Sequence, residues 1–114
     1  MPPAGPLGEF EVVILMAILH LQQAREDAFG SAIREEITRR SGREVSRGSI
    51  YITLDRLEEK GLLASRSGDT APGRGGRPKR LFSVTPAGKR AVRHSVTLFA
   101  RMHAGLEPIL ADLP

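Results

Sequence analysis

Five basic side chains gather in a short segment that is rich in glycine and proline. They are Arg66, Arg74, Arg77, Lys79 and Arg80, and Asp69 is the one acid among them. Guanidinium and ammonium groups on a projecting segment attract phosphates, so the cluster predicts a site for a polyanion such as a nucleic acid. A solvated loop that its arginines keep soluble is the alternative. Because the rest of the chain has equal numbers of acids and bases, this segment carries the whole net charge of +4.

The sequence gives little support to catalysis or metal binding. The chain has no cysteine, which excludes disulfides and thiolate zinc sites. His20, His94 and His103 stand far apart, and no paired carboxylates or Ser/His/Asp set can be recognised. The glycine-rich segment lacks the Gly-Lys-Ser or Gly-Lys-Thr ending of a P-loop. We therefore expect neither an enzyme nor a bound metal or cofactor.

Length and composition indicate one small globular domain. The chain has 114 residues, of which 40% are hydrophobic and only 4% aromatic, so its core must be mainly aliphatic. The longest apolar run, 12–19, is far shorter than the ~20 residues that span a bilayer. Acidic residues precede that run, which argues against a signal peptide. We expect a cytoplasmic protein.

Apolar periodicity places two helices in the first third of the chain, after a disordered leader at 1–7. Residues 8–23 are apolar nearly all round, so this helix must be buried on more than one side, in its own core or against a partner chain. Residues 29–40 repeat apolar side chains every four positions and predict an amphipathic helix. Gly42 is suited to end it.

Capping and turn residues define the remaining elements. Ser46 is a good N-cap for a helix over 46–60, with Gly61 in the left-handed position that follows it. Strands are predicted at 62–67 and 79–84, joined by a long loop tip. Thr85-Pro86 begins a last helix that runs to about Glu107.

Three helices followed by a hairpin with a basic tip form a winged helix-turn-helix, a mainly α fold with a small β-hairpin. Helix 46–60 then enters the major groove by its N-terminal residues, and the basic wing, residues 66–80, reaches the backbone or the minor groove. We divide the chain into a DNA-binding domain at 8–84 and a C-terminal dimerisation helix at 85–114.

The predicted DNA contacts come from the first turn, the flanks and the outer face of helix 46–60 and from the wing. They are Arg47, Ser49, Tyr51, Thr53, Arg56, Arg74, Arg77, Lys79 and Arg80. Tyr51 would donate through its hydroxyl while its ring packs, and Arg56 would either reach DNA or pair with an acid on its own helix. The acids Asp55, Glu58 and Glu59 would face phosphates unfavourably. We therefore expect the N-terminal half of the helix to contact the bases.

The last helix carries a heptad-like apolar seam that predicts a homodimer. The predicted dimerisation residues are Val92, Val96, Phe99, His103 and Leu106. The alternative is that this seam packs back on the first helix within one protomer.

Two blocks resemble the PadR family of transcriptional regulators. The first, GSIYITLDRLEEKGL at 48–62, is fairly specific. The second, RPKRLFSVTPAG at 77–88, would also suit MarR-type winged helices. The resemblance implies a homodimeric repressor that responds to a ligand or to stress and binds a palindromic operator. The length of the chain places it with the members that have a single C-terminal helix.

The chain departs from the family pattern in two places. Ile52 stands where the family often has proline, and the wing tip is long and rich in glycine and arginine. Members that trap flat drugs use a tryptophan at the dimer interface, and this chain has no tryptophan, so that mode of ligand binding is not expected. Two other functions remain open at this point. They are a MarR-like regulator and a winged-helix protein-interaction module without DNA binding, which the acids of helix 46–60 would favour.

Overall fold

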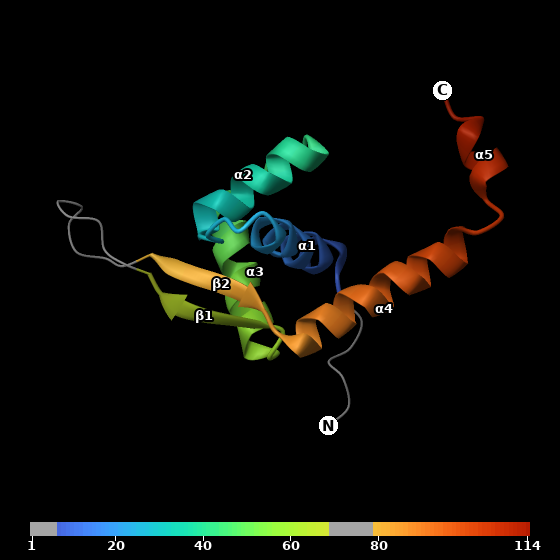
Figure 1. Cartoon of the computed structure of the whole chain (residues 1–114). Coiled ribbons are helices and arrows are strands. Elements are labelled where there is room, and N and C mark those ends of the chain that lie inside the picture. The colour runs from blue at the N-terminus through green and yellow to red at the C-terminus, as the bar shows by residue number, and fades with distance from the viewer. Residues whose placement is uncertain (1–6, 69–78) are drawn as a thin grey trace.

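The computed structural model describes residues 7–68 and 79–114, and its elements follow the predicted order (Figure 1). The elements are α1 (Glu9–Gln23), α2 (Gly30–Ser41), α3 (Arg47–Glu59), β1 (Leu63–Ser67), β2 (Arg80–Val84), α4 (Pro86–His103) and α5 (Glu107–Ala111). The two strands pair antiparallel, with Leu63 opposite Val84 and Ser67 opposite Arg80. The fold is therefore mainly helical with one small hairpin, as predicted.

Helix α1 lies at the centre of the core. It contacts α2, α3, α4 and β2, and its Ile14, Leu15 and Ile18 are completely buried. This burial explains why the helix is apolar nearly all round, because other elements of the same chain cover most of its circumference. Of the two explanations open from the sequence, burial in the chain's own core accounts for α1.

Local signals set most of the helix ends. The Ser46 side chain caps α3, and the Thr85 hydroxyl caps α4 by accepting from the Gly88 N–H at 3.0 Å. Gly42 and Gly61 adopt left-handed φ values of 72° and 77° after α2 and α3, a conformation that costs glycine little. These four predictions from the sequence are confirmed.

The C-terminal segment differs from its prediction. The expected single helix to about Glu107 is wrong, because α4 ends at His103 and a separate short helix follows. Ala104 has φ −55° and ψ 127° and Gly105 has a φ of 91°, so the backbone turns sharply between the two helices. Pro108, which lacks an N–H, fits the first turn of α5. Figure 1 shows α4 projecting from the body and α5 turning away at its far end.

Parts of two predicted segments lie outside the described residues. They are 1–6 of the leader and 69–78 of the wing tip. Leu7, the last residue of the expected leader, is partly buried against the core. At the base of the wing, the Gly68 N–H donates to the Lys79 carbonyl and extends the pairing of the two strands by one residue. Within the described ranges, no helix has both the length and the apolar character needed to cross a membrane.

Gly88 marks the closest approach between α4 and the body. A Cβ at this position would lie 2.2 Å from the Leu62 carbonyl oxygen and 2.7 Å from Cγ1 of Val84. One of these atoms belongs to the backbone, which cannot move aside cheaply. The absence of a side chain at Gly88 therefore lets α4 start directly against the hairpin.

We expect Gly88→Ala to lower the free energy of unfolding by about 1–3 kcal/mol, because the added methyl group overpacks this contact. Gly48→Ala is the matched control, since a Cβ at Gly48 meets nothing within 4 Å and alanine favours a helix by up to about 1 kcal/mol. Urea denaturation followed by circular dichroism measures both variants. Equal stability of the two would contradict this account of Gly88.

Candidate nucleic-acid interface

The turn before α3 is fixed by hydrogen bonds from α2. Nε of Arg34 donates to the Val45 carbonyl at 2.7 Å, and the Thr38 hydroxyl donates to the Arg43 carbonyl at 3.2 Å. Both bonds join the body of α2 to the loop that follows it. They set the angle at which the chain enters α3, which is the geometry that a helix-turn-helix pair requires.

The first turn of α3 is exposed. The Ser49 N–H donates to Oγ of Ser46 at 3.1 Å, and the two hydroxyl groups lie 2.7 Å apart. Residues 46–49 are all exposed, so the free N–H groups and the positive end of the helix dipole face solvent. This end of the helix can receive a phosphate.

The outer face of α3 continues from this turn with mixed chemistry. Arg47, Ser49 and Arg56 are exposed, in the positions predicted for DNA contacts. Ile52 lies between them with 61% of its surface exposed, an unusual place for a large apolar residue. An exposed aliphatic group on a groove-reading helix suits contact with a thymine methyl group.

On α3, the structure disagrees with the prediction for Thr53 and agrees with the expected packing of the Tyr51 ring. The predicted contact by Thr53 disagrees with the structure, because Thr53 is only 6% exposed. The buried face of α3 extends farther round the helix than the periodicity suggested. Tyr51 is half-buried, and a Cβ at Gly30 would lie 2.4 Å from its hydroxyl oxygen. Its ring therefore covers the start of α2, and the Arg47 guanidinium lies 5.7 Å from the ring centroid.

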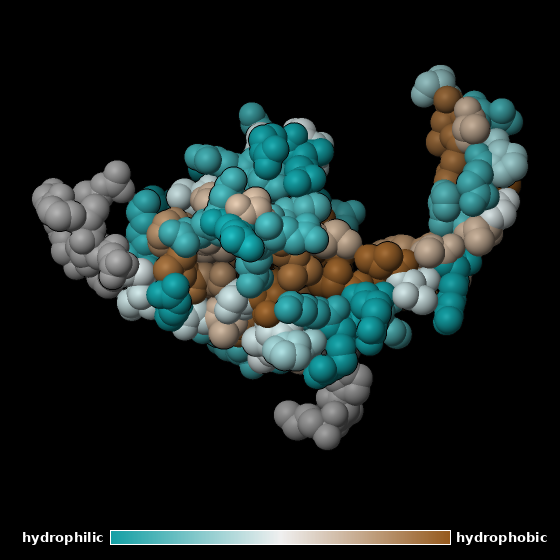
Figure 2. All heavy atoms as spheres, viewed as in Figure 1, coloured by the Kyte–Doolittle hydropathy of each residue, from teal (hydrophilic) through white to brown (hydrophobic). Residues whose placement is uncertain are grey.

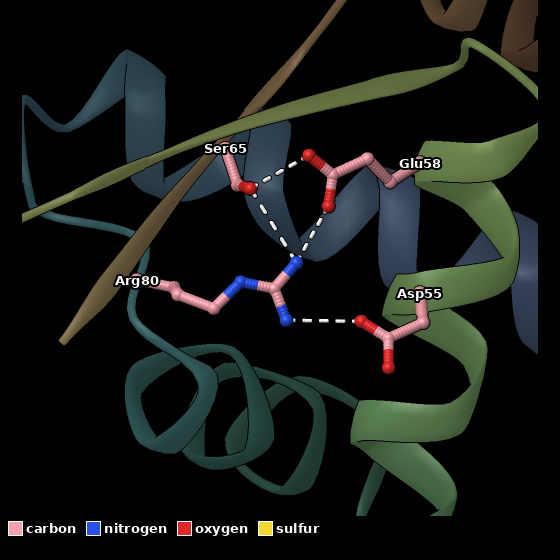
Figure 3. A network of polar contacts seen from close by, with 4 residues as sticks. All are labelled: Asp55, Glu58, Ser65 and Arg80. Carbon is pink, nitrogen blue, oxygen red and sulfur yellow. Dashed lines mark hydrogen bonds and ion pairs between the residues drawn. The ribbon is translucent and has the colours of Figure 1, made fainter.

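The base of the wing lies beside α3. Lys79 is exposed, with Nζ 5.0 Å from the centroid of the Phe29 ring. Arg80 does not point outward as a free wing cation, and the prediction that it contacts DNA disagrees with this geometry. Its guanidinium turns toward α3, where it meets two carboxylates (Figure 3). Arg74 and Arg77 lie outside the described residues.

This cluster is not among the predictions from the sequence. Arg80 is 25 and 22 residues from Asp55 and Glu58. No fixed spacing joins a strand to a helix that precedes it, so only the charges themselves, opposite in sign on adjacent elements, could have suggested the pairing. The pairing also weakens the case for an interaction module without DNA binding, since two of the acids that favoured it share a cation that offsets one of their two charges.

A second ion pair fixes the far end of α3 against α1. Nζ of Lys60 lies 2.7 Å from Oε2 of Glu11, whose other oxygen accepts from the Gly8 N–H at 3.0 Å. Burial opposes ionisation of Glu11, but these two hydrogen bonds and the charge of Arg56 hold its pKa below the usual value. The orientation of α3 is thus set at both of its ends.

The predicted dimer seam divides into two parts. Val92 is only 9% exposed and belongs to the core of its own protomer, so its assignment to the dimer interface is wrong. Beyond it, every residue from 96 to 114 is exposed, including Val96, Phe99, His103 and Leu106. The alternative that the whole seam packs on α1 therefore fails after the first turns of α4. Figure 2 shows apolar side chains along α4 and again on α5.

An exposed second helix of a helix-turn-helix pair, flanked by a hairpin, defines the winged helix-turn-helix class of DNA-binding proteins. The pattern of the transcriptional regulator PadR-like family matches residues 18–94, and the chain belongs to this family. It is a DNA-binding transcriptional regulator, and the family match decides against the MarR-like alternative.

Individual proteins agree with this assignment. The transcriptional regulator Rv3488 of Mycobacterium tuberculosis is 36% identical over 85 residues, which are 74% of each chain. A PadR family regulator from Clostridium difficile superposes with a TM-score of 0.69 at 19% identity, over 90% of this chain and 99% of the other. Bacillus subtilis PadR, solved in complex with operator DNA, superposes with a TM-score of 0.65 at 17% identity, over 80% of this chain and 48% of the other. At these identities the two structures show the common fold.

We expect Ser46→Ala to destabilise the protein by about 0.5–2 kcal/mol, because the Ser49 N–H loses its acceptor and the first turn of α3 frays. Ser46→Asp keeps an acceptor at this position and should remain close to the wild type. Urea titration gives the stability of each variant. If alanine and aspartate prove equivalent, the Ser46 cap is not what holds this turn.

Proposed function

We propose that the chain is a homodimeric repressor that binds a palindromic operator through α3 and the basic wing. The exposed first turn of α3 is the observation that carries the proposal, because it presents helix N–H groups, Arg47 and Ser49 without any covering element among the described residues. The operator complex of Bacillus subtilis PadR, a protein of the same fold, supports duplex DNA as the partner.

The proposed dimer forms through α4 and α5. The large exposed apolar residues of these helices and of the turns beside α5 are Val96, Leu98, Phe99, Met102, Leu106, Ile109, Leu110 and Leu113. So many apolar side chains on one projecting arm are rarely left in water, and they indicate a protein interface. A second copy of the chain offers the same surface, which makes a self-complementary twofold contact the simplest way to cover it.

A twofold axis gives the operator its symmetry. Two copies of α3 would enter successive major grooves about 34 Å apart, and the two wings would hold the flanking backbone. Arg47, Ser49 and Arg56 are the proposed contacts from α3. Lys79 is the proposed contact from the described base of the wing, and Arg74 and Arg77 are those from its tip.

The remaining expectations belong to the same proposal. Residues 8–84 would form the DNA-binding unit and 85–114 the dimerisation unit. An effector, where one acts, would bind between subunits near α1 and α4, since a ligand there can change the distance between the two α3 helices. The site of action would be the cytoplasm, and no catalytic step is part of the proposal.

We expect Arg47→Gln to weaken binding to a duplex that the wild-type protein selects from a random-sequence pool. Affinity should fall roughly tenfold, and the salt dependence of log K should lose about one unit of slope if the lost contact is to a phosphate. Fluorescence anisotropy over a series of salt concentrations measures both. Arg25→Gln, in the α1–α2 connection, is the control that should bind like the wild type.

Phe99→Asp tests the dimer. We expect it to weaken self-association by at least about thirtyfold, because an aromatic anchor is lost and a charge enters the apolar contact. Thr97→Asp places the same charge on the opposite side of α4 and should leave association intact. Sedimentation velocity over a concentration series gives the dissociation constants. A monomeric wild type, or a Phe99→Asp dimer of unchanged affinity, would refute this interface.

A further inference from the structure

The cluster formed by Arg80, Asp55, Glu58 and Ser65 joins the base of the wing to the middle of α3 (Figure 3). Nη1 of Arg80 donates to Oδ1 of Asp55 at 2.9 Å, and Nη2 donates to Oε1 of Glu58 at 2.5 Å. The Ser65 hydroxyl donates to the other oxygen of Glu58 at 2.7 Å and lies 3.4 Å from Nη2. Three elements, α3, β1 and β2, thus meet at one guanidinium group.

The packing around Arg80 holds this geometry. Its guanidinium carbon lies 4.9 Å from the centroid of the Phe82 ring, and Phe82 belongs to the buried core. The hydrogen bond to Asp55 is the main reason why the pKa of Arg80 is raised above its usual value. With both terminal nitrogens turned toward carboxylates, the guanidinium cannot offer the same two-pronged donor face to a DNA phosphate.

The distribution of charge along α3 shows why the cluster matters for DNA binding. The helix carries two basic and three acidic residues, and its acids all lie in the C-terminal half. Asp55 and Glu58 share that half with Arg56, an exposed residue that is one of the proposed DNA contacts. Carboxylates near phosphates oppose binding, unless a cation of the protein neutralises them first.

We infer that Arg80 is a positioning residue, which pairs with Asp55 and Glu58, offsets one of their two negative charges and fixes the wing against α3 so that both can meet one duplex. This inference rests on the proposed function, in which α3 and the wing contact DNA together. Arg80 then acts on DNA binding through these two carboxylates. The rival is a direct role, in which Arg80 leaves the carboxylates and grips a phosphate itself.

A mutant cycle separates the two roles. The variants are Arg80→Gln, the double variant Asp55→Asn with Glu58→Gln, and the combination of all three substitutions. Each is measured for affinity and salt slope on the selected duplex, and by urea titration to confirm that it is folded. The combination leaves no unpaired charge in the cluster, so it keeps the test informative if Arg80→Gln alone folds poorly.

If Arg80 is a positioning residue, the effect of Arg80→Gln on DNA affinity depends strongly on whether Asp55 and Glu58 are charged. Arg80→Gln alone should weaken binding about tenfold or more, whereas in the Asp55→Asn, Glu58→Gln background it should change affinity less than about threefold and leave the salt slope unchanged. Arg66→Gln removes the same charge from the neighbouring strand. Its effect should be the same in both backgrounds.

Two results would overturn the inference. Arg80→Gln could still weaken DNA binding in the Asp55→Asn, Glu58→Gln background and reduce the salt slope by about 0.9. That result would make Arg80 a phosphate ligand. Unchanged affinity of a folded Arg80→Gln protein would leave the cluster a role in stability alone. Failure of the proposed function is a different result, because the wild-type protein would then select no duplex at all.

Discussion

The burial of α1 on nearly every side is the constraint on which the rest of the structure depends. Because α2, α3, α4 and β2 all contact this one helix, their positions relative to each other follow from how each packs on it. The core is aliphatic, and Ile14, Leu15 and Ile18 have no exposed surface. Such a core is close-packed and rigid, so the exposed turn of α3 and the hairpin are presented together as one surface.

The sequence predicted what local chemistry decides. The hydroxyl groups of Ser46 and Thr85 and the left-handed glycines act within a few residues of themselves, so the element order, the helix starts and the winged helix class could all be read from the chain. Periodicity also found the exposed positions of Arg47, Ser49 and Arg56. Periodicity could not predict the width of the buried face of α3, because that width depends on neighbours distant in sequence. Thr53 lies within this buried face and not on the exposed surface.

The remaining differences have the same origin. Val92 fits the apolar seam of α4 by spacing, but whether its neighbour is α1 or another chain is decided by how far α4 runs along the body. Arg80 belongs to a basic cluster by composition, yet two carboxylates on α3 turn its guanidinium toward that helix. Charge counted along the chain therefore overstates the charge that the wing offers to a partner, since tertiary ion pairs remove part of it.

The projecting arm of α4 and α5 affects how steeply promoter occupancy depends on the amount of the regulator. Every residue from 96 to 114 is exposed in a single copy, and the proposed pairing would shelter the arm. At low abundance, the number of paired molecules then rises with the square of the amount synthesised. Promoter occupancy would respond more steeply to expression level than a one-subunit binder allows, with no effector required.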